Sequence, residues 1–63
     1  MIGRRIRALR EAKGWSQDDL ARRAKLTKPY VSMLETGVRK QPSLPTLRRL
    51  AKALGVPITE VLA

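Results

Sequence analysis

Residues 15–37, WSQDDLARRAKLTKPYVSMLETG, contain the start and stop signals of two short helices. Ser16 can cap the first helix, and Asp19, three residues later, completes a shortened form of the capping box. Thr27 is placed in the same way before the second helix, which Gly37 ends. Because only a three-residue turn separates the two segments, the stretch predicts a helix-turn-helix.

The apolar residues of this stretch are spaced for two helices that cross. The second helix of such a motif lies across the first, so apolar side chains are needed at fixed offsets, with a small one at the crossing. We expect these positions to be filled by Leu20, Ala21, Ala24, Leu26, Val31 and Leu34, with Ala21 at the crossing. The outer face of the second helix carries an unusual mixture for a surface that contacts only water: Lys28, Pro29, Ser32 and Met33.

The rest of the chain predicts three more helices and no strand. Helical spacing of apolar residues recurs over three segments, at about residues 3–13, 44–54 and 57–62. No segment alternates with the period of two that strands show. The helix that follows Ser43 carries an apolar stripe of Leu44, Leu47, Leu50, Ala51 and Leu54. We therefore expect an all-α fold with one domain over residues 1–63.

Composition argues against a metalloprotein and against an enzyme. The 63 residues include no Cys and no His, on which zinc, iron–sulfur and haem sites depend. Only five carboxylates are present, and the four glycines are dispersed rather than gathered into a phosphate-binding loop. Few general acids or bases are therefore available. We expect no metal, no cofactor and no catalytic residue, and no small-molecule ligand is evident.

The charge of the chain points to a polyanionic partner. Fourteen Lys and Arg stand against five Asp and Glu, which gives a net charge of +9 and a computed pI of about 11.5. Nucleic acid is the first expectation and an anionic membrane surface the second. A solvated, Arg-rich surface that binds no anion is the third possibility.

No segment approaches the roughly 20 apolar residues of a membrane span. The start, MIGRRIRALR, has positive charge but no continuous apolar run after it, so it does not read as a signal peptide. A cytoplasmic location is therefore the default expectation.

Residues 15–37, followed by PSLPTLRRLAKALGV, resemble the Cro/repressor-type helix-turn-helix family, also called the XRE family. The shared features are Ser-Gln at the start of the first motif helix, Leu-Ala inside it, Leu-Glu-x-Gly at the end of the second, and Leu-Ala-x-Ala-Leu-Gly-Val further on. The family includes phage repressors, restriction–modification controller proteins and antitoxins. The resemblance covers nearly the whole chain and implies a compact five-helix, lambda-repressor-like DNA-binding domain. Lys25 departs from it, because the family usually has Gly at this turn position, which often needs a positive φ.

The resemblance implies a transcriptional regulator, of repressor type, that binds double-stranded DNA with the helix at 28–36 in the major groove. The residues expected to contact bases are Thr27, Lys28, Pro29, Ser32 and Met33. Those expected to contact phosphates are Gln17, Tyr30, Thr36, Arg39 and Lys40. Small phage repressors also pair an Arg of the first helix with a Glu late in the recognition helix, and Arg10 and Glu35 stand at the matching positions.

Simpler roles remain open for several of these residues. Lys28 is otherwise a solvated lysine, Met33 a packing residue, Tyr30 a core residue at the helix junction and Gln17 an idle residue at a helix start. Arg48, Arg49 and Lys52 are expected to form a solvated face, with DNA contact the minority alternative.

We expect the protein to assemble in order to recognise a site. One recognition helix covers few base pairs, so we expect a homodimer on a palindromic operator. Its interface is expected in the C-terminal segment from Pro57 to Ala63, whose apolar residues are Ile58, Val61 and Leu62.

The same fold can also serve an antitoxin or another protein-interaction module. The third class is an anionic-membrane binder that uses the Arg-rich first helix.

Overall fold

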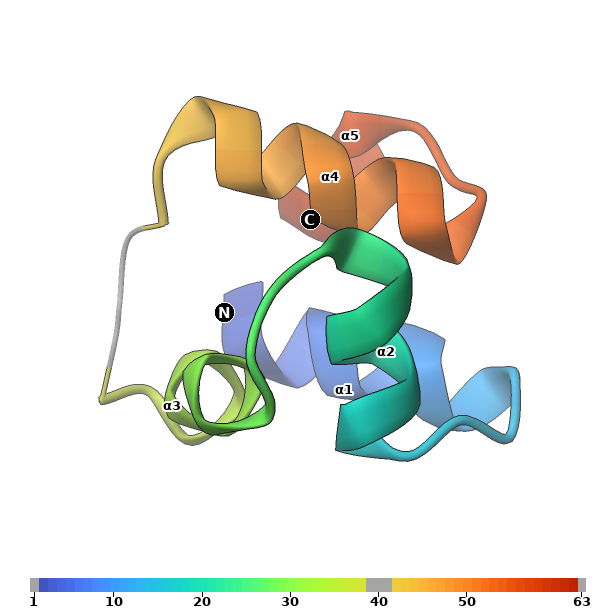
Figure 1. The fold of residues 1–63 in the computed structure, drawn as a ribbon. Helices are drawn as coiled ribbons and strands as arrows, with labels where there is room; N and C mark the ends of the chain where they lie inside the picture. The colour runs from blue at the N-terminus through green and yellow to red at the C-terminus, as the bar shows by residue number, and fades with distance from the viewer. Residues whose placement is uncertain (1, 39–41, 63) are drawn as a thin grey trace.

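The computed structural model describes residues 2–38 and 42–62, which form five α-helices and no strand (Figure 1). In chain order these are α1 (Ile2–Ala12), α2 (Gln17–Ala24), α3 (Lys28–Thr36), α4 (Leu44–Leu54) and α5 (Ile58–Leu62). Figure 1 shows α4 and α5 at the top, α1 and α3 at the bottom, and α2 standing between the two levels. The predicted all-α fold is confirmed, with helix bounds within about one residue of those expected, which is ordinary uncertainty at helix ends.

The core draws side chains from all five helices. The largest fully buried side chains are Ile6, Leu20, Leu34, Leu50, Leu54, Val31 and Val61. Burying each one contributes about 1.5–3 kcal/mol to the stability of the fold. The residues expected at the crossing of α2 and α3 are buried, apart from Leu26, which is half-buried. Packing of the two motif helices is therefore as predicted.

Two apolar residues differ from the sequence prediction. The prediction that Leu44 belongs to the buried stripe is wrong, because its side chain is 50% exposed. Leu44 is the first residue of α4, and the buried residues of this helix begin one turn later, at Leu47. The prediction that Val61 adds apolar surface at the C-terminal segment is also wrong, because Val61 is 0% exposed. Leu62, at 49% exposed, is the large apolar residue that α5 leaves open.

Hydrogen bonds at the helix starts follow the predicted caps. The hydroxyl of Ser16 accepts from the backbone N–H of Asp19 at 3.0 Å, and the Asp19 carboxylate accepts from the Ser16 N–H at 2.8 Å. The bond that the Asp19 carboxylate accepts from the Ser16 backbone is the main reason why the pKa of Asp19 is lowered. The Thr27 hydroxyl accepts from the N–H of Tyr30 at 3.3 Å, as expected where Pro29 has no N–H to donate. The caps fix where α2 and α3 begin.

Lys25 ends α2 in the left-handed conformation, with φ 58° and ψ 43°. The other positive-φ residues in the described part of the chain are all glycines: Gly14, Gly37 and Gly55. A residue with a Cβ costs about 1 kcal/mol or more in this conformation. The positive φ expected at the turn is confirmed, and Lys25 holds it under strain.

A close approach of backbones sets α1 against the C-terminal end of α3. A Cβ built at Gly3 would collide with the carbonyl oxygen of Leu34 and lie 3.0 Å from that of Glu35. Only glycine therefore allows this packing without a shift. The approach holds α3 at the edge of the molecule with its other side free.

Candidate nucleic-acid interface

The outer face of α3 gathers the residues predicted to contact bases. Thr27, Lys28 and Pro29 are exposed, and Ser32 and Met33 are partly exposed. Lys28 and Ser32 are four residues apart, as are Pro29 and Met33, so both pairs follow one side of the helix. The opposite side of α3 is buried in the core. The structure brings these side chains together, and their contact with bases stays a prediction.

The residues predicted to contact phosphate are less uniform. Arg39 and Lys40 lie outside the described residues. Thr36 is exposed, and its hydroxyl donates to the backbone carbonyl of Ser32 at 3.0 Å, so its proton is engaged within the helix. Tyr30 is half-buried and packs against the hydrophobic core, which favours its alternative reading as a packing residue. Their phosphate contacts stay predictions.

Arg10 and Glu35 form the predicted ion pair. Nε of Arg10 lies 2.8 Å from Oε2 of Glu35, and Nη2 lies 2.9 Å from Oε1, so the contact is bidentate. The side chains are 10% and 3% exposed. Nη1 of Arg10 donates to the carbonyl of Trp15 at 2.7 Å, and the Gln17 amide donates to Glu35 at 3.1 Å. The network therefore ties α3 to α1 and to the start of α2.

The network favours the charged forms of both partners. The hydrogen bond that Arg10 donates to Glu35 raises the pKa of Arg10 above its usual value. Burial alone would raise the pKa of Glu35, but hydrogen bonds from Arg10 and Gln17, with the charges of Arg10 and Arg7, outweigh burial and lower that pKa. Both side chains are therefore ionised at neutral pH.

Gln17 is the first residue of α2 and is not idle, because it bonds to the carboxylate of Glu35. A primary amide has two N–H donors, so one remains for a phosphate. The first backbone N–H groups of a helix also favour an anion. Arg22 partly neutralises the two neighbouring carboxylates: its Nε lies 3.7 Å from Oδ2 of Asp18, and its Nη2 lies 2.8 Å from Oδ1 of Asp19. Phosphate contact by Gln17 stays a prediction.

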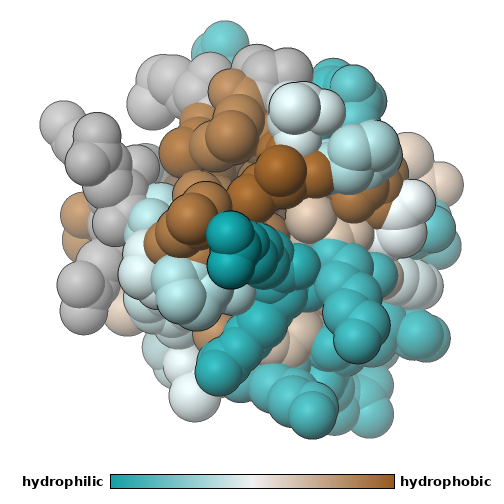
Figure 2. All heavy atoms as spheres, turned by 90° about the horizontal axis from the view of Figure 1, so that it is seen from above, coloured by the Kyte–Doolittle hydropathy of each residue, from teal (hydrophilic) through white to brown (hydrophobic). Residues whose placement is uncertain are grey.

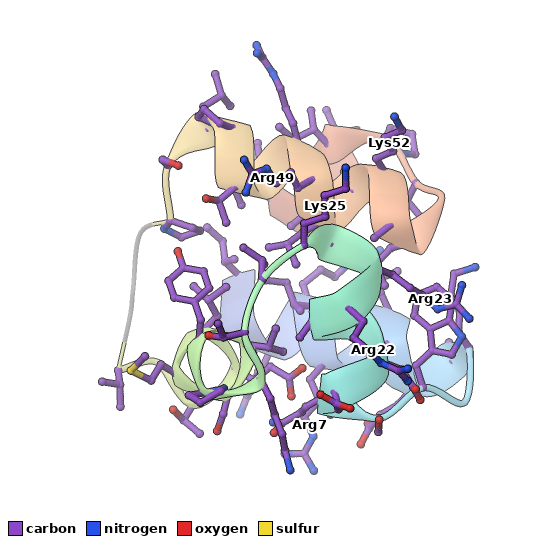
Figure 3. All side chains as sticks on the ribbon, in the orientation of Figure 1. Arg7, Arg22, Arg23, Lys25, Arg49 and Lys52 are labelled. Atoms are coloured by element: carbon purple, nitrogen blue, oxygen red, sulfur yellow. The ribbon has the colours of Figure 1, made fainter. Side chains whose placement is uncertain are left out.

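Arg7 is a further candidate that the sequence analysis did not single out. Its charge reaches Glu35, and Figure 3 shows it on the lower side of the molecule, where α3 also lies. Its exposed pair with Glu11, at 3.3 Å, contributes about 0–1 kcal/mol and leaves donors for a phosphate. The signal was its spacing of three residues from Arg10, which places both on the side of α1 that faces α3.

Membrane contact and metal binding are two other classes of site that the described residues can be searched for. In the part of the chain that the structure describes, no helix is long and apolar enough to cross a membrane. Within the same residues, no cluster of three or more acidic, His or Cys side chains could hold a metal ion. The apolar residues of α1 are also engaged in packing: Ile6 is buried, and Ile2 and Leu9 pack against the core. The Arg-rich first helix therefore has no free apolar face for a membrane surface.

The arrangement defines a class of protein. Two short helices joined by a tight turn, with the second helix at the surface and one side of it exposed, are the arrangement of helix-turn-helix domains. The chain belongs to the helix-turn-helix family, whose sequence profile matches residues 6–61.

Similar proteins agree with this assignment. The chain is 41% identical over 61 residues to the HTH-type transcriptional regulator SlrR of Bacillus subtilis, covering 97% of this chain and 40% of that protein. It resembles a crystal structure of SinR, the master regulator for biofilm formation, in complex with DNA, at a TM-score of 0.95 and 35% identity over all of both chains. It also resembles the restriction–modification controller protein C.AhdI of Aeromonas hydrophila, at a TM-score of 0.89 and 40% identity, covering 95% of this chain and 89% of that one.

The chain spans about half the length of the curated relatives it matches. The relatives described above are named as regulators of transcription or as a restriction–modification controller protein.

Proposed function

We propose that this protein binds double-stranded DNA in a sequence-specific way and regulates transcription, as a repressor acting as a homodimer. The observation that supports the proposal is the exposed outer face of α3, which carries Lys28 and Ser32, in a fold that matches DNA-bound SinR at a TM-score of 0.95. The phage immunity repressor of phi105, 37% identical over 60 residues, supports the repressor role. A cytoplasmic location is part of this proposal, because a regulator of transcription acts where its DNA is.

Each residue type on this face suits a distinct contact. Lys28 suits the O6 and N7 acceptors of guanine, whereas Pro29 and Met33 offer apolar contact, for example to a thymine methyl group. Ser32 can donate to or accept from either base type. Thr27 stands at the N-terminus of α3, where its methyl group can also approach a base.

Phosphate contacts would position α3 rather than select the sequence. The residues that we assign to them are Gln17, Tyr30, Thr36, Arg39, Lys40 and Arg7. Gln17 has a special place among them, because its amide bonds Glu35 at 3.1 Å and so links the phosphate contact to the position of α3. Helix α3 would then contact the bases correctly only when the DNA backbone is bound at Gln17.

The proposed dimer uses surface that the core leaves open. Figure 2 shows apolar side chains gathered over α4 and α5, and the exposed leucines of these helices are Leu44 and Leu62. So small a patch gives a weak dimer in free solution. A palindromic duplex strengthens it, because both subunits are then held in register.

Selection of bound duplexes from a random pool tests this proposal. We expect enrichment of a palindrome whose half-sites are centred about one DNA turn, roughly 34 Å, apart. Recovery of duplexes with no shared sequence, at affinities equal to that of the starting pool, would contradict sequence-specific binding.

A further inference from the structure

A basic cleft lies between the C-terminal end of α2 and α4. It encloses about 520 Å³ and is lined by Arg23, Ala24, Lys25, Arg49, Lys52 and Ala53, a set that we call the α2–α4 cleft. Figure 3 shows Lys25, Arg49 and Lys52 in the upper part of the molecule, whereas α3 lies at the lower left. The cleft is therefore separate from the outer face of α3.

The cations of this cleft have no carboxylate to neutralise them. The chain contains five Asp and Glu. All five pair with arginines outside the cleft, in the pairs Arg5–Glu60, Arg7–Glu11, Arg10–Glu35, Arg22–Asp18 and Arg22–Asp19. Among the described residues, the recorded charge contact of the cleft cations is that of Arg23 with the ring of Trp15, at 4.3 Å. The like charges of Lys25, Arg49 and Lys52 line one hollow, and an anion in it would relieve their mutual repulsion.

Lys25 adds a second, independent observation. It occupies a left-handed position, whereas the other positive-φ residues within 2–38 and 42–62 are glycines. Strained backbone positions cluster at functional sites. The strained Lys25 is one of the residues that line the cleft.

We propose that the α2–α4 cleft binds a run of phosphate groups. The cationic lining comes from the C-terminal end of α2, its cap Lys25 and α4, and its positive charge suits an oligophosphate. The small side chains of Ala24 and Ala53 leave room for phosphates to approach. No aromatic side chain lines the cleft, so recognition is of the phosphates and not of a stacked base. The phosphates come either from a free oligophosphate or from the backbone of a second DNA duplex. This site goes beyond the proposed reading of an operator by α3.

Titration of the 63-residue chain with inorganic tripolyphosphate, without DNA, tests the site directly. Calorimetry measures affinity, and the emission of Trp15, the only tryptophan, reports displacement of Arg23 from its ring. We expect saturable binding that weakens about tenfold in Arg49→Glu and in Lys52→Glu. Arg48→Glu is the matched control, because it makes the same charge change on α4 without lining the cleft. It should weaken binding much less.

Lys25→Gly separates binding from folding. Glycine relieves the strain at position 25, so this variant should keep or raise the unfolding temperature while its tripolyphosphate affinity falls severalfold. If Lys25 served only to offset the negative end of the α2 dipole, its affinity for tripolyphosphate would be unchanged. Any of three results would overturn the proposal. These are an unchanged affinity for tripolyphosphate in Lys25→Gly, a loss of affinity in Arg48→Glu equal to that in Arg49→Glu, and no saturable binding of tripolyphosphate to the wild-type protein.

A second titration identifies the source of the phosphates. Protein saturated with its selected operator is mixed with a second, unrelated duplex, and bridged complexes are measured by sedimentation. Bridging that Arg49→Glu abolishes assigns the cleft to a second DNA backbone. Tripolyphosphate binding without bridging assigns it to a free oligophosphate. Lys28→Ala, on α3, should leave tripolyphosphate binding unchanged, so failure of operator reading and failure of the cleft are distinguishable.

Discussion

Arg10 and Glu35 form a bidentate ion pair between α1 and α3, with side chains only 10% and 3% exposed. A buried pair of this kind is strongly destabilised when one partner is removed, because the other charge remains buried alone. Glu35→Ala should therefore destabilise the fold by about 3–5 kcal/mol, and Arg10→Met with Glu35→Leu by clearly less. Urea unfolding of both single variants and the double variant measures the coupling. Additive effects with no coupling would contradict the account.

Acid should weaken the fold through the same pair. Because the pKa of Glu35 is lowered in the folded state, its contribution to stability is fully present above the pKa that Glu35 has in the unfolded chain. This contribution is lost as the pH falls from there through the folded pKa. Thermal unfolding between about pH 6 and pH 2 should show a decline that is shallower in Glu35→Gln. Parallel pH profiles of the wild type and Glu35→Gln would refute this assignment.

Relief of strain at the α2–α3 turn should be measurable in stability. Lys25→Gly should stabilise the protein by up to about 1 kcal/mol, since φ of 58° favours glycine. Lys25→Ala is the matched control, because it removes the charge but keeps the Cβ and should bring no such gain. A loss of stability in Lys25→Gly larger than in Lys25→Ala would show that the side chain itself stabilises the turn.

Several features of the fold could be predicted because they depend on neighbouring residues. The capping box at Ser16 and the cap at Thr27 each follow from residues within one turn. The positive φ of Lys25 was expected only from the family resemblance, in which glycine usually occupies this position. The pair of Arg10 with Glu35 crosses 25 positions and came only from the family resemblance. Local pattern alone could not have found it.

Other features depend on how the helices are placed. The α2–α4 cleft was missed because the sequence shows Arg49 and Lys52 only as a solvated face of a helix. It does not show that α4 packs beside the C-terminal end of α2. The bond from Gln17 to Glu35 was missed for the same reason. The sequence likewise overestimated the burial of Leu44, because an apolar stripe does not show where the neighbouring helix ends.

Affinity for DNA should fall steeply with salt. If a dimer neutralises about eight phosphates, the slope of log affinity against log salt should be near −7. Fluorescence anisotropy with a labelled operator at a series of salt concentrations measures this slope. A slope shallower than about −2 would exclude backbone neutralisation as the main source of affinity.

The dimer should depend on the exposed apolar residue of α5. Leu62→Asp should leave the monomer fold intact, because Leu62 is 49% exposed, but should weaken cooperative binding to a palindromic site. Analytical ultracentrifugation with and without the duplex measures assembly, and thermal unfolding is the control for folding. Operator affinity equal to that of the wild type would show that the interface lies elsewhere.

The central claim is that the outer face of α3 reads bases. The most direct measurement compares Lys28→Ala and Arg39→Ala for binding to the selected operator and to random duplex at one salt concentration. We expect Lys28→Ala to lose about 1–3 kcal/mol on the operator and little on random DNA. Arg39→Ala should weaken both alike. Equal losses on operator and random duplex in Lys28→Ala would contradict the claim.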